Sequence, residues 1–259
     1  MKKRILFVFI VAFTTIVLSL GVLYIHVRAD WLAKYQVDTD IKGYRLSHPA
    51  PYANSPYWSV AFVLEYDKLS AHLNQWGYFE YNDFHGTYYN TDNGLRRTVG
   101  QPLVYAHTIW LFGNSGTLDP YVPDAYTMAS QLQALLPHQR VMNMGMGGAH
   151  VNAELLSLQH THIRPGDAVI FIDGGMDMQD NTPIDRYWKT VNSAHEYALA
   201  RGASFQHYIQ PCYDMAFEQP LTGPRFTVPV SMFVDHGCHM QEHGDSIVAQ
   251  TLFDVLTTF

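Results

Sequence analysis

The sequence predicts an α/β domain with a parallel β-sheet, preceded by one N-terminal transmembrane helix. Three observations carry this prediction. After Gly100, short apolar runs alternate with longer segments of helical periodicity, which is the pattern of βαβ units. The short runs are apolar on both faces, as in the covered strands of parallel sheets. Ahead of them, the segment from Ile5 to Val27 contains no Lys, Arg, Asp or Glu.

The composition excludes several classes of protein. The chain has 259 residues, of which 47% are hydrophobic and 15% charged, so it is neither a disordered chain nor a coiled coil. Its formal net charge is −7 and no basic stretch follows the first four residues, so we expect no nucleic-acid partner. Two cysteines can form neither a disulfide scaffold nor a four-thiolate zinc site.

The apolar segment from Ile5 to Val27 is long enough to cross a hydrocarbon core of roughly 30 Å as a helix. The basic residues Lys2, Lys3 and Arg4 precede it and keep the N-terminus in the cytoplasm. We therefore expect a single-span anchor and an extracytoplasmic domain, in the periplasm or at the cell surface. A cleaved signal peptide is the alternative, because residues 27–29 suit a signal peptidase, but secretory apolar regions are usually shorter.

The chain divides into three predicted parts: an anchor over residues 1–28, an aromatic-rich lead-in over 29–100 that packs on the main domain, and the main domain over 101–259. The lead-in shows only a weak helical pattern, from Ser59 to Leu73. The main domain has four predicted strands, at Thr108–Phe112, Arg140–Met144, Ala168–Ile172 and Ser204–Ile209. Its predicted helices are Ala125–Leu136, Ala149–Leu158, Ile184–Arg201 and Gly244–Leu256.

Ligands of open α/β sheets bind beyond the carboxyl ends of the strands, so the residues that follow each strand are the candidates for chemistry. The first strand runs into Gly113-Asn114-Ser115-Gly116-Thr117, a tight turn from which the Ser115 hydroxyl can project as a nucleophile. An ordinary strand-to-helix turn is the alternative, because Gly, Asn and Ser favour turns and caps.

Two further strand ends carry turn residues. The second ends in a glycine-rich turn, residues 143–148, whose N–H groups could hold an oxyanion; the alternative is close helix packing. Its glycine spacing does not match a dinucleotide-binding turn, so no cofactor is expected. The third strand runs into Asp173-Gly174-Gly175-Met176-Asp177, which alone indicates little.

The final helix is preceded by Asp235-His236-Gly237-Cys238-His239, in which a carboxylate could orient a histidine base. Asp235, His236, His239 and His243 could instead form a metal site. We do not favour that alternative and expect no metal, because a zinc enzyme adds a third well-placed ligand and a general base.

The order Gly-Asn-Ser, Asn-x-Gly-x-x-Gly, Gly-Gly-x-Asp, then Asp and His before a last helix resembles the SGNH (GDSL-type) hydrolase superfamily over residues 100–259. Residues 86–98 resemble a lead-in segment of its membrane-anchored or exported members. The resemblance implies a flavodoxin-like three-layer α/β/α sandwich. It also implies Ser115 as nucleophile, His239 as base and Asp235 as the acid that orients it. The oxyanion donors would be the N–H groups of Ser115 and Gly148 and an asparagine side chain in the third motif.

The chain departs from this pattern at three places. The asparagine position of the third motif holds Met176, whose thioether donates no hydrogen bond. Losing such a donor costs about 10²- to 10³-fold in rate, unless Asn114 or Asn181 replaces it. Asn114 itself stands where the family has Asp. Asp235 lies four residues before His239 rather than three, although the spacing from His239 to the final helix matches the family and favours His239 over its neighbouring histidines.

Cys212 and Cys238 both belong at the carboxyl edge of the sheet, and an exported domain faces an oxidising space. A bridge between them would pin the loop that carries His239. Two unpaired buried thiols are the alternative.

The leading functional hypothesis is an extracytoplasmic serine esterase, acyl hydrolase or O-acyltransferase. Its substrate would be an acyl ester, and we expect the acyl group to sit on a cell-surface glycan or exopolysaccharide. Several aromatic residues of the lead-in could stack on sugars, although they could equally be packing residues: Trp58, Trp76, Tyr78, Tyr88 and Tyr89. The alternative function is a catalytically weakened binding or assembly subunit of a membrane-associated complex, for which Met176 is the main argument.

Overall fold

The computed structural model describes residues 15, 19, 21–22, 62, 65, 68–212, 221–233 and 238–257. Most of the expected transmembrane segment lies outside these residues, and so does Asp235. Within the described residues, no helix combines the length and the apolar character that crossing a bilayer requires. The chain divides into two units, residues 1–42 and 43–259, and the fold described below is that of the second unit.

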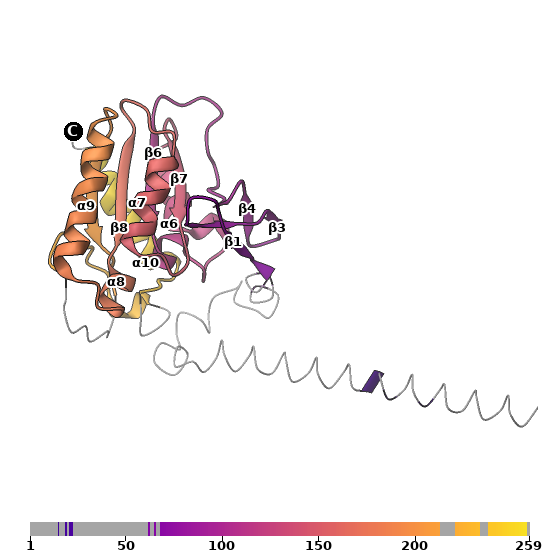
Figure 1. Cartoon of the computed structure of the whole chain (residues 1–259). Helices are drawn as coiled ribbons and strands as arrows, with labels where there is room; N and C mark the ends of the chain where they lie inside the picture. Colours follow the sequence, from indigo (N-terminus) through magenta and orange to yellow (C-terminus); the bar gives the residue numbers. More distant parts are fainter. Residues whose placement is uncertain are drawn as a thin grey trace, which may run out of the picture. The chain divides into compact units, whose positions relative to one another are not determined.

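The centre of this unit is a four-stranded parallel sheet, made of β6 (Thr108–Gly113), β7 (Arg140–Gly145), β8 (Ala168–Asp173) and β9 (Ser204–Ile209) (Figure 1). The strand order is β7-β6-β8-β9, so β6 is flanked by β7 and β8. The four predicted strands are thus confirmed. The chain reverses direction across the sheet at β6, which makes the carboxyl end of β6 the topological switch point of this fold.

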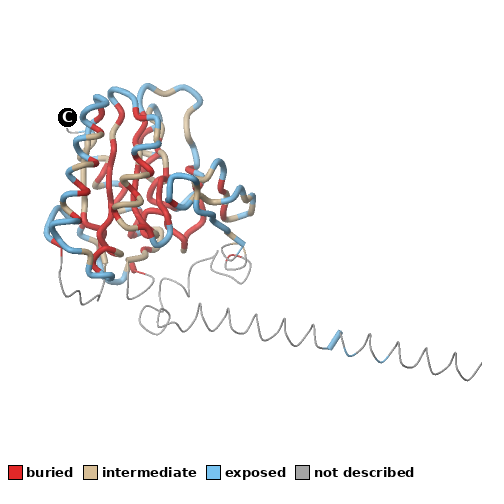
Figure 2. The backbone as a smooth tube through the Cα atoms, viewed as in Figure 1, coloured by how far each residue is buried: buried red, intermediate tan, exposed pale blue. Residues whose placement is uncertain are grey.

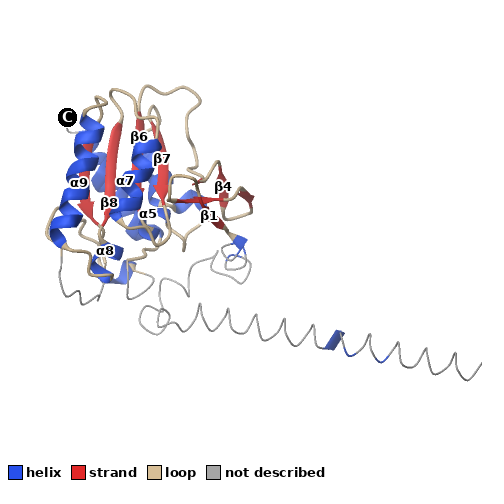
Figure 3. Ribbon diagram, viewed as in Figure 1, coloured by secondary structure: helices blue, strands red, loops and turns tan. Residues whose placement is uncertain are grey.

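Helices cover both faces of the sheet, which gives three layers (Figure 3). One face packs against α6 (Met128–Leu135) and α10 (Glu242–Thr257), and the other packs against α7 (Val151–His160) and α9 (Ile184–Leu199). Figure 2 shows the strands as the most buried part of the unit, with alternating burial on the helices. Leu111, Ile170 and Phe171 are fully buried, as expected for strands covered on both sides.

The described residues also form four short helical segments, of which only the second overlaps a predicted helix, Ala125–Leu136, because one turn is too short to show periodicity. They are α5 (Ser115–Leu118), η1 (Asp124–Tyr126), α8 (Gly175–Gln179) and η2 (Val230–Met232). The first and third follow directly after β6 and β8, so they begin at the edge of the sheet where ligands bind.

The described lead-in forms two small antiparallel sheets, which were not predicted from the sequence. One contains β1 (Ala71–Leu73) and β2 (Phe79–Tyr81); the other contains β3 (Phe84–His85), β4 (Asn90–Asp92) and β5 (Leu95–Arg96). The helix predicted from Ser59 to Leu73 is therefore wrong at its end, where Ala71–Leu73 pairs with Phe79–Tyr81.

The second small sheet also has a place in the larger fold. Strand β5 packs beside β7, so the lead-in covers an edge of the main sheet. The connection that follows is solvent-exposed: the exposed fraction is 100% for Leu103 and 88% for Val104.

Candidate active site

Ser115 and His239 meet at the carboxyl edge of the sheet, although 124 positions separate them in sequence. The Nε2 atom of His239 lies 2.9 Å from the Oγ atom of Ser115. Ser115 is the first residue of α5, directly beyond β6, and His239 precedes α10. Both side chains are half-buried, so the pair is accessible to a small molecule. This is the geometry that a histidine base needs to take the proton of a serine nucleophile.

The turn that presents Ser115 is built by its neighbours. Asn114 is the N-cap of α5, and its Oδ1 accepts a hydrogen bond from the Gly116 N–H at 2.9 Å. A Cβ atom at Gly116 would collide with the Nε2 of Gln210 and displace that side chain. At Gly113, a Cβ atom would collide with the carbonyl oxygen of Ile172. The two glycines therefore let β6, β8 and α5, here called the serine helix, approach one another closely.

Two backbone N–H groups are suitable as oxyanion donors. Neither the Ser115 N–H nor the Gly148 N–H donates a hydrogen bond to another described residue. Gly148 is exposed, with a φ of 71°, and a Cβ atom added there would meet no other atom within 4 Å. The Oδ2 of Asp177 accepts the Val151 N–H at 3.0 Å, which ties the third motif to the loop that carries Gly148.

The third expected oxyanion donor is missing, as the sequence implies. Met176 lies half-buried in α8 and offers no polar hydrogen. Asn181 is exposed beyond the end of that helix, with a φ of 53°. Asn114 lies beside the third motif, because a Cβ atom at Gly175 would be 3.5 Å from its Nδ2. Asn114 is thus an amide that could compensate for Met176.

The loop that carries His239 is fastened on two sides. Cys212 and Cys238 form a disulfide, which joins the end of β9 to the residue before His239. The Nε2 of Gln210 donates a hydrogen bond to the Cys238 carbonyl oxygen at 3.1 Å. The ring of Tyr121 meets the imidazole edge-on, with centroids 5.0 Å apart. No sequence motif singled out Gln210 or Tyr121, although Gln210 directly follows the fourth strand, where site residues were to be expected.

A pair of buried carboxyl groups lies behind the serine helix. Asp119 caps the C-terminus of α5, and its Oδ2 accepts the Met128 N–H at 2.7 Å. Its neighbour is the carboxyl group of Asp245 in α10, and both residues are at most 3% exposed. Burial raises the pKa of Asp119 to about 7 and raises the pKa of Asp245 well above its usual range.

A second buried acidic group lies under the third motif, on the other face of the sheet. Asp173, at the end of β8, accepts a hydrogen bond from the Tyr187 hydroxyl and lies 3.0 Å from the Nε2 of His207. Glu154 is its fully buried neighbour. Burial, reinforced by the charge of Asp173, raises the pKa of Glu154 well above its usual range. No sequence motif marks His207, and in the structure it supports the strand end.

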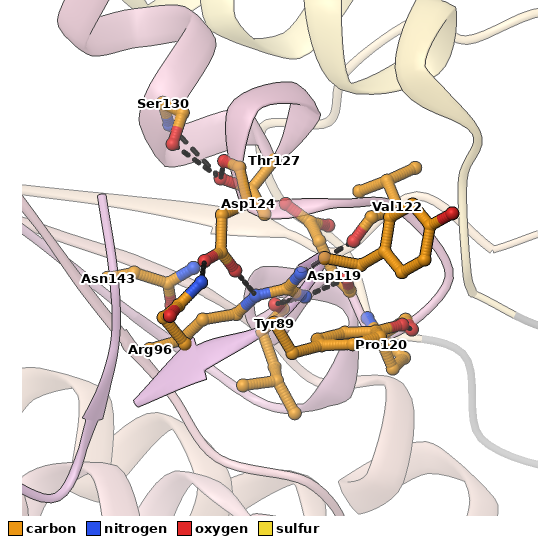
Figure 4. A network of polar contacts seen from close by, with 12 residues as sticks. Tyr89, Arg96, Asp119, Pro120, Val122, Asp124, Thr127, Ser130 and Asn143 are labelled. Atoms are coloured by element: carbon orange, nitrogen blue, oxygen red, sulfur yellow. Dashed lines mark hydrogen bonds and ion pairs between the residues drawn. The ribbon is translucent and has the colours of Figure 1, made fainter. Parts of the chain in front are cut away.

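A buried arginine organises the loop that follows the serine helix (Figure 4). Arg96, from β5, is 3% exposed, and its Nε lies 3.1 Å from the Oδ1 of Asp124. Its guanidinium carbon lies 4.4 Å from the centroid of the Tyr89 ring. The same guanidinium donates to three main-chain carbonyl groups, those of Leu118, Asp119 and Val122. Tyr89 is accordingly a core residue and not a surface platform for sugars.

The remaining expectations for this region have mixed outcomes. Asp235 and His236 lie outside the described residues. The side chain of His243 is 71% exposed and lies 3.7 Å from Glu242. Within the described ranges, no group of three or more His, Cys, Asp or Glu side chains could hold a metal ion.

A cavity of about 240 Å³, lined by Trp110 and Met142 among others, lies along β7 and not at Ser115.

Comparisons with known proteins show similarity in fold. No protein-family model matches the chain, and no curated protein matches it. Among solved structures, a member of the lipolytic protein G-D-S-L family from Veillonella parvula DSM 2008 aligns with a TM-score of 0.50 and 17% identity, over 60% of this chain and 100% of that one.

Two further solved structures align less well. TesA aligns with a TM-score of 0.47 and 16% identity, over 58% of this chain and 98% of its own. The psychrotrophic esterase EstA from Pseudoalteromonas sp. aligns with a TM-score of 0.35 and 14% identity, over 40% of this chain and 60% of its own. The Veillonella structure carries the conclusion: the described α/β core has the fold of a G-D-S-L lipolytic protein.

Proposed function

We propose that the chain is a serine esterase or acyl hydrolase in which Ser115 is the nucleophile and His239 the general base. The observation that carries the proposal is the 2.9 Å contact between the Ser115 hydroxyl and the His239 imidazole at the switch point of the sheet. The shared fold with a G-D-S-L lipolytic protein supports it. Asp235, four residues before His239, is proposed as the acid that orients the imidazole.

The reaction follows from these positions. The Oγ of Ser115 attacks the carbonyl carbon of an ester while the Nε2 of His239 takes its proton. The N–H groups of Ser115 and Gly148 would stabilise the oxyanion, which collapses as His239 returns the proton to the leaving alcohol. The acyl-enzyme is then resolved by water, or by the hydroxyl of an acceptor in the transferase variant of the proposal.

The substrate and the location are further parts of the proposal. An N-terminal anchor would place the domain outside the cytoplasm, where acylated glycans of the cell surface or of an exopolysaccharide are available. The disulfide supports an oxidising location. Of the aromatic residues considered for sugar stacking, Trp76 supports the glycan substrate: it is 44% exposed and its ring stacks on Tyr78 with an interplanar angle of 15°.

The test uses the full-length chain purified in detergent, with fluorophosphonate labelling and the turnover of a small acetyl ester as readouts. We expect Ser115→Ala and His239→Ala to lose both. The matched controls are Ser204→Ala, an exposed serine at the start of β9, and His243→Ala, an exposed histidine of α10; both should behave as wild type.

A second candidate function is favoured by Met176, which leaves the third motif without its hydrogen-bond donor. In this candidate the fold serves as a binding or assembly subunit of a membrane-associated complex. If wild-type protein fails to label under conditions in which a known serine hydrolase reacts, the esterase proposal is wrong and this candidate replaces it.

A further inference from the structure

Arg96 belongs to the one sequence motif, in residues 86–98, that the proposed reaction does not use. Its contacts divide into two kinds. The Nε atom faces the carboxylate of Asp124, at 3.1 Å. The Nη atoms face main-chain carbonyl oxygens: Nη1 donates to Leu118 at 2.9 Å and to Asp119, and Nη2 donates to Val122 at 2.5 Å. An ion pair with Asp124 alone would not require these hydrogen bonds from the Nη atoms to main-chain carbonyl groups.

The Leu118 carbonyl ends the serine helix, and the Asp119 and Val122 carbonyls lie in the loop that follows it. The serine helix α5 has four residues, so it provides little stability of its own. Its last carbonyl groups have no partner within the helix and need donors from outside. Arg96 supplies these donors from β5, and the Asp119 N–H closes the helix on the Ser115 carbonyl at 3.0 Å.

The same loop also reaches the proposed base. Tyr121 lies between Asp119 and Val122, whose carbonyl groups accept hydrogen bonds from Arg96. The ring of Tyr121 contacts the imidazole of His239. The lead-in holds the neighbouring residue as well, because the Tyr89 hydroxyl donates to the Pro120 carbonyl. The loop is therefore fixed from the lead-in side at several points, and it contacts both Ser115 and His239.

We propose that Arg96 is a positioning residue of the active site: through the carbonyl groups of residues 118–122 it fixes the Ser115 helix and the Tyr121–His239 contact. The inference rests on the proposed function and extends the catalytic unit into the lead-in. Because the guanidinium acts through the backbone and does not face the substrate, its loss should lower kcat and leave KM nearly unchanged.

The experiment separates the hydrogen bonds that Arg96 donates to the carbonyl groups of residues 118, 119 and 122, here called the carbonyl clamp, from the ion pair between Arg96 and Asp124. Asp124→Asn removes the carboxylate charge and keeps the clamp. The double variant Arg96→Met/Asp124→Asn removes both charges together, which avoids an unpaired buried carboxylate. Arg97→Met is the matched control, because Arg97 is the adjacent arginine and is exposed. All variants are made in the full-length chain, and their unfolding in urea is recorded beside kcat and KM for the acetyl ester.

We expect Arg97→Met and Asp124→Asn to keep kcat within about 3-fold of wild type, and the double variant to fold and lose about 10- to 100-fold in kcat. A folded double variant with the kcat of Asp124→Asn would overturn the proposal. If the double variant does not fold, Arg96→Lys replaces it as the test. An ammonium group keeps the positive charge but cannot donate to three carbonyl groups as the planar guanidinium does, so we expect the same loss in kcat.

A spectroscopic readout distinguishes failure of this inference from failure of the proposed function. The imidazole signal of His239, assigned by its loss in His239→Ala, is followed by NMR in protein with ¹³C-labelled histidine. A shift of this signal in the double variant but not in Asp124→Asn supports the positioning role even if wild type has no esterase activity. An unshifted signal refutes the role.

Discussion

Removal of the Cys212–Cys238 disulfide should weaken both the stability of the fold and the reactivity of Ser115. The bridge closes a loop with a sequence separation of 26. The chain-entropy relation for such a loop gives about 3.5 kcal/mol of stabilisation through the unfolded state. For a domain of this size, that corresponds to a fall in Tm of about 7–14 °C.

The effect on reactivity follows from the place of the bridge. Cys238 precedes His239, and without the bridge the loop loses its covalent link to the end of β9 and keeps only non-covalent contacts, such as the Gln210 hydrogen bond to the Cys238 carbonyl. We expect Cys212→Ser/Cys238→Ser to label with fluorophosphonate about 10-fold more slowly than wild type, because the base is less well placed.

The assay compares urea unfolding and labelling rates for wild type and for the double serine variant, each with and without a reducing agent. Reduced wild type should match the double variant, and the reducing agent should leave the double variant unchanged. If removal of the bridge lowers the free energy of unfolding by less than about 1 kcal/mol and leaves the labelling rate unaltered, the reasoning is refuted.

Three further predictions follow from the site. Met176→Asn should raise acetyl-ester turnover about 10-fold or more, since it restores an oxyanion donor; unchanged turnover would mean that another group already supplies it. Gln210→Met should slow labelling about 10-fold and lower stability by about 1 kcal/mol, because it removes the hydrogen bond to the Cys238 carbonyl, whereas the buried Oε1 of Gln210 has no described partner to lose. Because the pKa values of Asp119 and Asp245 are raised in the folded state, the folded protein keeps a proton that the unfolded chain releases above about pH 4. The free energy of unfolding should therefore fall as the pH rises from about 4 toward about 7. Asp245→Asn should flatten this slope in urea titrations, and a slope equal to that of wild type would contradict the assignment.

The part of the fold that can be predicted from the sequence is the part in which hydrophobic residues follow one regular pattern over a long segment. The four strands of the main sheet and their crossover helices could be located because each forms a run of six or more residues; β6, β7 and β8 are mostly buried, whereas β9 is mostly half-buried. The strands of the lead-in could not, because segments of two or three residues such as Leu95–Arg96 are too short to show a period. For the same reason the one-turn helices α5 and α8 were missed.

The candidate site divides in a similar way. Ser115 could be singled out from its turn, and the choice of His239 as its partner came from the resemblance to a family. The supporting residues were beyond reach, because they depend on contacts between distant segments: Asp119 with Asp245, and Arg96 with the loop after Ser115. No local pattern marks such a partner, since burial and pairing are decided by the packing of the whole sheet.

The exposed connection at Leu103 and Val104 has a practical consequence. A protease that nicks the chain there would cut an accessible segment and leave the buried contacts of Arg96 and the packing of β5 against β7 intact. The two fragments should then stay associated and active, whereas a recombinant fragment that starts at residue 101 would lack the guanidinium. The lead-in is therefore better regarded as a complementing fragment of the α/β domain than as a linker, and expression of that domain should begin before it.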